Sequence, residues 1–153
     1  MQASTLLLTA VTLATACAPE ARPESKPRLE LRAAPGGEDV AGLVRTELGN
    51  ARRAGKQLLV YVGASWCEPC QRFHDAAAAG QLDDALGQLR LLEFDHDRDL
   101  DALHRAGYKS ELIPLFALPK PDGTSSGRQI EGSIKGEGAV AEITPRLRAL
   151  LVQ

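Results

Sequence analysis

Two cysteines, Cys67 and Cys70, stand two residues apart where an apolar run gives way to an amphipathic stretch. The run 57–62 is almost continuously apolar and rich in β-forming residues, which is typical of a strand buried on both faces of a sheet. Residues 68–79 follow a helical pattern, and Pro69 fits its first turn, where backbone N–H groups have no helical partner. The chain is therefore expected to carry a cysteine pair at the start of a helix that follows a central strand.

The same patterns recur along the chain and predict alternating strands and helices, closed by a β-hairpin around a Pro-Asp-Gly turn at 121–123. Predicted strands cover 29–31, 57–62, 89–95, 115–118 and 128–131, and predicted helices cover 39–54, 68–79, 99–106 and 138–151, with a short helix or turn at 82–89. Pro145 lies inside the last helical pattern, so that helix has an alternative late start at Ala141 or Glu142. This order predicts an α/β fold with a central mixed β-sheet flanked by helices.

The length, composition and net charge of the chain exclude some classes of function. The chain has 153 residues, of which 44% are hydrophobic and 25% charged, as expected for one globular domain. The formal net charge is -2, which gives no basic excess of the kind that binds nucleic acid, so no nucleic-acid partner is expected.

The N-terminal segment is uncharged up to Cys17, and its apolar part, 6–16, is shorter than the roughly 20 residues of a membrane span. It fits the apolar region of a signal peptide. Residues 13–17 resemble a bacterial lipobox, which implies cleavage before Cys17 and lipidation of its thiol. The alternatives are a plain secretory signal cut near Ala16 or Ala18, and a structural N-terminal helix.

The chain is therefore expected to divide into a signal peptide with a lipobox at 1–17, a linker at 18–37 and a folded domain at 38–153. The linker is rich in Pro, Ala and charged residues, and it is expected to be flexible because it has little apolar surface to bury. The folded unit is expected to begin between Leu29 and Glu38.

The cysteine pair suits disulfide exchange. A thiol at a helix N-terminus is close to free N–H groups and to the positive end of the helix dipole, so the pKa of Cys67 is expected to be lowered. Cys67 is then the attacking thiolate, and Cys70 lies close enough to bond it and resolve the mixed disulfide. Pro69 stiffens the turn, whereas Glu68 adds a negative charge that opposes thiolate formation. Trp66 is expected to shield the sulfurs, with core packing as the alternative.

The run Trp66-Cys67-Glu68-Pro69-Cys70 resembles the active site of the thioredoxin superfamily, and the resemblance covers residues 39–153. It implies a thioredoxin fold and thiol–disulfide oxidoreductase activity on protein substrates, without a cofactor. It also implies that Pro114 is a cis-proline facing the cysteines and that the backbone of Ile113 pairs with the substrate. Gly132 matches a glycine that such proteins keep close to the active site.

The Glu-Pro dipeptide between the cysteines resembles membrane-tethered thioredoxin-like proteins that reduce apocytochrome c. This resemblance implies a reducing rather than an oxidising role in the cell envelope. The expected protein is a monomer on the periplasmic side of a bacterial membrane, held by a lipid anchor at Cys17, with a membrane electron donor that recycles the dithiol. The alternative locations are soluble periplasmic and secreted.

The sequence departs from cytoplasmic thioredoxin at Tyr61, which stands where that family has a buried Asp used in proton transfer. Glu93, on the neighbouring predicted strand, falls near the place of the family's partner lysine. A buried carboxylate has a raised pKa, so Glu93 is a candidate for the proton relay. The alternative is a strand-edge or solvent-facing glutamate.

Two other classes of function remain open. In the first, Cys67, Cys70 and His74 bind a soft metal such as copper, which would make the protein a thioredoxin-fold metallochaperone. In the second, the cysteine pair is only structural and the domain is a non-catalytic interaction module. Haem attachment is excluded because Gln71, and not a histidine, follows Cys70. The acidic run 95–99 is interpreted as a solvated loop with a helix N-cap.

Overall fold

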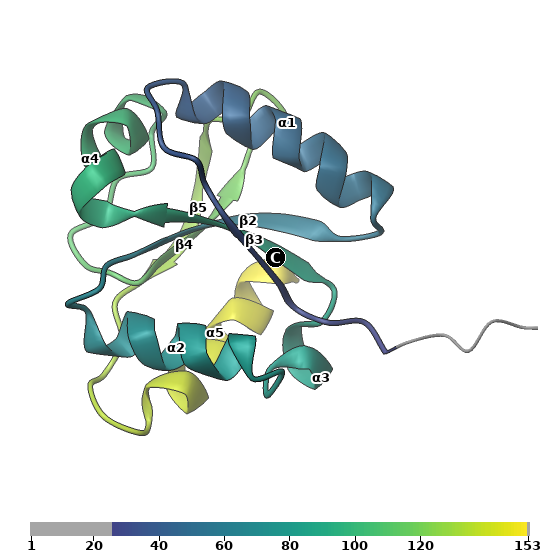
Figure 1. Cartoon of the computed structure of the whole chain (residues 1–153), viewed down its shortest axis with the longest axis vertical. Helices are drawn as coiled ribbons and strands as arrows, with labels where there is room; N and C mark the ends of the chain where they lie inside the picture. Colours follow the sequence, from purple (N-terminus) through teal and green to yellow (C-terminus); the bar gives the residue numbers. More distant parts are fainter. Residues whose placement is uncertain (1–25, 153) are drawn as a thin grey trace, which may run out of the picture.

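The computed structural model describes residues 26–152 (Figure 1). The predicted signal peptide, Cys17 and the first part of the predicted linker lie outside the described residues. Among residues 26–152, no helix is long and apolar enough to cross a membrane.

The core of the fold is a five-stranded sheet in the order β1-β3-β2-β4-β5. Its strands are β1 (Glu30–Ala33), β2 (Gln57–Gly63), β3 (Leu89–Asp95), β4 (Leu115–Pro119) and β5 (Ser125–Glu131). The first three strands run parallel, whereas β4 pairs antiparallel with both β2 and β5. The predicted α/β architecture with a central mixed sheet is therefore confirmed.

Helices cover both faces of this sheet (Figure 1). The helices α1 (Val40–Arg53) and α4 (His96–Arg105) pack on one face, and α2 (Glu68–Ala78), α3 (Asp83–Leu86) and α5 (Ala139–Leu151) pack on the other. The strand β2 is buried on both faces because alternate residues point to opposite sides: Val60 joins the core under α1, and Tyr61 joins the core under α2. Burial on both faces of the sheet thus explains the continuous apolar run of β2, as the sequence predicted.

Two elements begin earlier than predicted, and the alternative late start of α5 is wrong. Helix α4 begins at His96, earlier than expected, because the Asp95 carboxylate caps it by accepting a hydrogen bond from the Arg98 backbone N–H at 2.9 Å. Strand β5 begins at Ser125 because it pairs with Pro119 beyond a register shift in β4. Helix α5 begins at Ala139 and continues through Pro145, so the late start is wrong.

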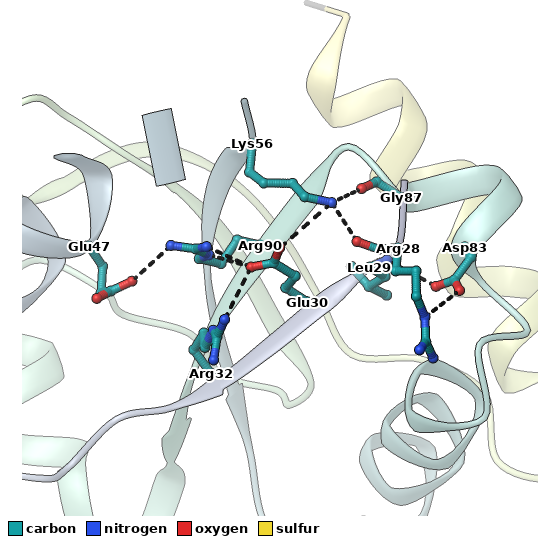
Figure 2. A network of polar contacts seen from close by, with 9 residues as sticks. All are labelled: Arg28, Leu29, Glu30, Arg32, Glu47, Lys56, Asp83, Gly87 and Arg90. Carbon is teal, nitrogen blue, oxygen red and sulfur yellow. Dashed lines mark hydrogen bonds and ion pairs between the residues drawn. The ribbon is translucent and has the colours of Figure 1, made fainter. Parts of the chain in front are cut away.

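Strand β1 corrects the predicted domain boundary. It lies at 30–33, inside the range 18–37 that was assigned to the linker, and pairs with β3 in parallel register. The buried Arg90 guanidinium holds it, donating to the Glu30 carboxylate at 2.7 Å (Figure 2). The Lys56 ammonium also donates to the carbonyl oxygens of Arg28 and Gly87. The strand expected at 29–31 is therefore present and extends to Ala33, and the predicted linker is too long at its C-terminal end. Leu29 and Leu31 contact the core, and the charged pairs add to this hold.

The chain enters the described domain beside α3. Asp83 accepts hydrogen bonds from the Leu29 backbone N–H at 2.9 Å and from the Arg28 guanidinium at 3.1 Å (Figure 2). This point lies at the end of the sheet where Gln57 and Leu89 are paired, whereas β2 leads to the cysteine pair from Gly63 at the opposite end. The entry point and the cysteine pair therefore lie at opposite ends of the sheet.

Candidate active site

Cys67 and Cys70 form a disulfide at the N-terminus of α2, with an S–S bond of 2.03 Å and a Cα–Cα distance of 5.2 Å. Cys67 is the N-cap residue, and its Sγ accepts a hydrogen bond from the backbone N–H of Cys70 at 3.3 Å. Pro69 occupies the first turn of α2, where backbone N–H groups have no helical partner, so the helix loses no hydrogen bond to the proline. The structure therefore brings the predicted pair together, in the predicted strand–turn–helix setting.

Both cysteines are almost buried, with exposed fractions of 5% for Cys67 and 3% for Cys70. They border different hollows. Cys67 lines a groove of about 440 Å³ together with Trp66, Leu112 and Ile113. Cys70 lines a separate cavity of about 390 Å³ on the other side of the disulfide. Each cysteine of the pair therefore borders its own hollow, Cys67 the groove and Cys70 the cavity.

A loop before β4 closes one side of the groove. The Ile113–Pro114 peptide bond is cis, and the carbonyl oxygen of Ile113 lies 3.8 Å from Cys67 Sγ. Gly132 donates its backbone N–H to the carbonyl oxygen of Pro114 at 2.9 Å. A side chain is disfavoured at Gly132, because its φ is +63° and a Cβ there would lie 2.9 Å from Leu112 Cδ1. The structure thus places Ile113, Pro114 and Gly132 beside the cysteines.

Trp66 forms part of the groove wall and is 63% exposed, so the core-packing alternative is wrong. Its indole N–H donates to Asp97 Oδ2 at 2.8 Å, and its ring meets the His96 ring edge-on at 5.9 Å. Hydrogen bonds from His96 and Trp66 lower the pKa of the Asp97 carboxyl. Sequence reasoning missed His96 and Asp97 as site residues, because a contact across 31 positions leaves no local pattern.

The negative charge of Glu68 is offset by its partners. Its carboxylate accepts a hydrogen bond from the Arg72 guanidinium at 2.9 Å and another from the Gly136 backbone N–H at 3.2 Å. These contacts, with Arg72 first, lower the pKa of the Glu68 carboxyl. The opposition to thiolate formation predicted for Glu68 is therefore reduced by a neighbouring positive charge on the same helix.

Tyr61 and Glu93 are directly paired neighbours on β2 and β3, and both line the cavity behind Cys70. The Tyr61 hydroxyl donates to the carbonyl oxygen of Cys70 at 3.2 Å. Burial, and then the nearby Glu93 charge, raise the pKa of Tyr61 far above its usual range, so it stays protonated. Burial also raises the pKa of Glu93, against a lowering by His74. The Glu93 side chain is only 26% exposed, so it is partly buried rather than solvent-facing.

His74 lies one turn after Cys70 and faces Glu93, with 3.6 Å between His74 Nε2 and Glu93 Oε2. Within residues 26–152, no group of three or more His, Cys, Asp or Glu side chains is arranged to hold a metal ion. The copper-binding alternative therefore has no preformed site in this arrangement, in which the two cysteines are bonded to each other.

The fold and the disulfide define the class: a thioredoxin-fold protein with a cysteine pair at a helix N-terminus. Residues 44–121 match the family described as thioredoxin-like, and this is just over half of the chain. The chain therefore belongs to the thioredoxin-like family. The family, the fold and the disulfide together support a thiol–disulfide oxidoreductase.

Solved structures agree on the fold. Fasciola hepatica thioredoxin is 18% identical and gives a TM-score of 0.50, covering 78% of this chain and 96% of its own. A chain from work on thiol resolution in yeast mitochondrial 1-Cys peroxiredoxin via glutathione/thioredoxin systems is 19% identical, with a TM-score of 0.51. That match covers 80% of this chain and 95% of the other. No curated protein matches the chain. The predicted thioredoxin fold is thus confirmed.

Proposed function

We propose that the protein is a disulfide reductase for protein substrates in the cell envelope. The observation that carries the proposal is the Cys67–Cys70 disulfide itself, which lies at the N-terminus of α2 beside the Ile113–Pro114 loop. The dithiol is the electron-donating form, and oxidation of the dithiol returns the disulfide seen here.

The N-terminus of α2 prepares Cys67 for nucleophilic attack. In the reduced protein, the N–H of Cys70 that now contacts Cys67 Sγ would donate to the thiolate, and the helix dipole adds to this stabilisation. The Cys67 thiolate attacks a substrate disulfide, forming a mixed disulfide and releasing one substrate thiolate. Cys70 then attacks Cys67 Sγ, which releases the second substrate thiolate and leaves the Cys67–Cys70 disulfide. Two electrons pass from the dithiol to the substrate.

The groove beside Cys67 suits an extended polypeptide segment. Two large apolar side chains that line the groove are exposed, at 63% for Trp66 and 60% for Leu112. Ile134, which is 55% exposed, lies between the lining residues Ser133 and Lys135 in the sequence. Exposed apolar side chains gathered at one place are typical of a surface that contacts a protein partner. The carbonyl oxygen of Ile113 lies 3.8 Å from Cys67 Sγ in the same groove, where the backbone of Ile113 is available to pair with a substrate chain.

The proposed location rests on the predicted signal peptide and on the resemblance of residues 13–17 to a lipobox. The entry of the chain beside α3 supports this arrangement, because a tether there leaves the opposite end of the sheet, with its disulfide, free for partners. A membrane protein with its own dithiol would return electrons to the oxidised pair. Mass analysis of the mature N-terminus tests the anchor: a lipid-modified Cys17 supports it, and an unmodified Cys17 contradicts it.

Insulin reduction by the full chain, with dithiothreitol as the electron source, tests the activity. The wild-type protein should accelerate precipitation of the insulin B chain, and Cys67→Ser should abolish the acceleration. Cys17→Ser is the matched control, since it removes a cysteine outside the proposed active site and should keep full activity. Equal activity in the wild type and Cys67→Ser would contradict the proposed function.

A further inference from the structure

The groove beside Cys67 contains a histidine that the two steps of the proposed reaction do not use. His96 is the first residue of α4, directly after the end of β3, and it lines the groove together with Cys67. Its side chain is 28% exposed, so the ring is partly covered but remains in contact with solvent. Since histidine gains and loses a proton near neutral pH, a proton can be given up in the groove and recovered from water.

Asp97 fixes the orientation of the His96 ring. Asp97 Oδ1 lies 2.9 Å from His96 Nδ1, and Asp97 Oδ2 accepts the Trp66 indole N–H at 2.8 Å. The hydrogen bonds from His96 and Trp66 lower the pKa of the Asp97 carboxyl, so at neutral pH it is ionised and only accepts hydrogen bonds. The hydrogen in the contact with His96 therefore lies on Nδ1. Nε2 has no hydrogen-bond partner among residues 26–152, which leaves it available to a substrate.

The other polar groups of the groove are poor proton donors to a thiolate. They are the carboxylates of Glu68 and Glu111, the hydroxyls of Ser110 and Ser133, and the ammonium of Lys135. Ionised carboxylates have no proton to give, and the Arg72 partner lowers the pKa of Glu68. A lysine ammonium holds its proton more tightly than a thiol does, and a serine hydroxyl is a far weaker acid than either. An imidazolium is a stronger acid than an alkyl thiol, so its proton transfers favourably.

Both steps of the exchange release a substrate sulfur into this groove. The attacking, attacked and leaving sulfurs of a disulfide exchange lie roughly in line. Cys70 lies on the cavity side of Cys67 Sγ, so the substrate sulfur that it displaces leaves on the groove side. An alkyl thiolate leaves slowly, because exchange is faster when the leaving thiol has a lower pKa. A proton delivered to the sulfur as it leaves removes this disadvantage.

We propose that His96 is a catalytic residue that gives the proton on Nε2 to the substrate sulfur as it leaves. This inference rests on the proposed reductase function. In the first step, the bond from Cys67 Sγ to one substrate sulfur forms, the substrate S–S bond breaks, and the departing sulfur keeps the electron pair and takes the proton. In the second step, the Cys67–Cys70 bond forms and the bond from Cys67 to the substrate breaks, with the same proton transfer. His96 recovers its proton from solvent between the steps.

Two disulfides with the same net negative charge at neutral pH can test this role. Reduction of 5,5′-dithiobis(2-nitrobenzoate) releases an acidic aromatic thiol, which leaves as a stable thiolate. Reduction of oxidised glutathione releases an alkyl thiol, whose pKa is near the value of about 8.5 for free cysteine. The reduced full chain, with Cys17→Ser as the background, is mixed with each disulfide and quenched with acid. Mass analysis then follows the reduced chain, the mixed disulfide and the oxidised chain, which gives the rates of both steps.

His96→Gln should slow both steps with oxidised glutathione at least about 10-fold, since general acid catalysis typically contributes roughly 10²–10⁴-fold. Both steps with 5,5′-dithiobis(2-nitrobenzoate) should keep the wild-type rates, because a stable thiolate needs no proton to leave. His104→Gln is the matched control, because it makes the same change on the same helix at a residue that does not line the groove. It should alter neither reaction.

Two results would overturn the inference. Wild-type rates with both disulfides in His96→Gln would show that the proton does not come from His96. Equal slowing with both disulfides would show that His96 only shapes the groove or attracts anions. Failure of the proposed function gives a different result, since the wild-type chain would then not accelerate insulin reduction.

Discussion

The two sides of the Cys67–Cys70 disulfide differ in chemistry. The Cys67 side is a groove with exposed apolar side chains, including Trp66 and Leu112, and a loop carbonyl close to Sγ. The Cys70 side is a cavity bordered by ionisable groups, with Glu93 and His74 in contact. The difference predicts that substitutions on the groove side change the binding of a polypeptide substrate, whereas substitutions on the cavity side do not.

The largest effects are expected from substitution of the two cysteines, which should block different steps of the reaction. Cys67→Ser should abolish reduction of insulin, because no nucleophile remains in the groove. Cys70→Ser should still attack the substrate but fail to release it, so a mixed disulfide between Cys67 and the substrate should accumulate. Non-reducing electrophoresis with mass analysis checks this. Accumulation in Cys67→Ser instead would reverse the assigned roles.

The apolar groove wall should matter only for polypeptide substrates. Leu112→Ser should raise the KM for insulin about 5- to 10-fold, since burying part of a leucine side chain contributes about 1–1.5 kcal/mol. The reaction with 5,5′-dithiobis(2-nitrobenzoate) should stay unchanged, because a small disulfide does not span the groove. Steady-state kinetics with both substrates provides the comparison. An equal loss with both substrates would show that Leu112 supports the disulfide rather than the substrate.

Tyr61→Phe tests the cavity side without changing the groove. It removes the hydrogen bond to the carbonyl oxygen of Cys70 and should lower the free energy of unfolding by about 0.5–1.5 kcal/mol. The KM for insulin should remain at the wild-type value. Urea denaturation of the oxidised chain measures the first effect, and insulin kinetics measures the second. A raised KM would mean that the two sides are not independent.

The smallest effect is expected at Asp97, which holds the Trp66 indole. The pKa of Asp97 is lowered, so its contribution to the folded state is present above its unfolded pKa and is lost as the pH falls through the lower folded pKa. Trp66 fluorescence should therefore show a transition in acid. Asp97→Asn should remove this acid transition. An acid transition that persists unchanged in Asp97→Asn would contradict the assignment.

The sequence predicts the central elements because their causes are local. The apolar run of β2 and Pro69 in the first turn of α2 both leave patterns within a few residues, and they place Cys67 at the N-cap. The structure and the family match then confirm the fold that the cysteine motif implied. A proton-relay role for Glu93 stays a prediction, although its partial burial beside Cys70 is now established.

The parts that sequence reasoning missed depend on distant partners. Strand β1 was expected at 29–31 but continues to Ala33, and charges from elsewhere in the chain, such as that of Arg90, help to hold it. The hydrogen bond from the Trp66 indole to the Asp97 carboxylate connects the turn before α2 to the start of α4, 31 positions away. Pro145 was an ambiguous signal, because a proline inside a helical pattern usually ends or delays the helix. In α5 the buried residues on both sides of it, Ile143 and Leu147, hold the helix against the sheet.

The reduction potential of the Cys67–Cys70 pair tests the central claim, that the protein is a reductant, most directly. It can be measured by equilibrating the full chain with dithiothreitol redox buffers and counting free thiols at each ratio, with Cys17→Ser as the background so that only this pair contributes. A value near about −270 mV, comparable to thioredoxin, is the predicted result. A value near about −120 mV, comparable to strong periplasmic oxidants, would contradict it.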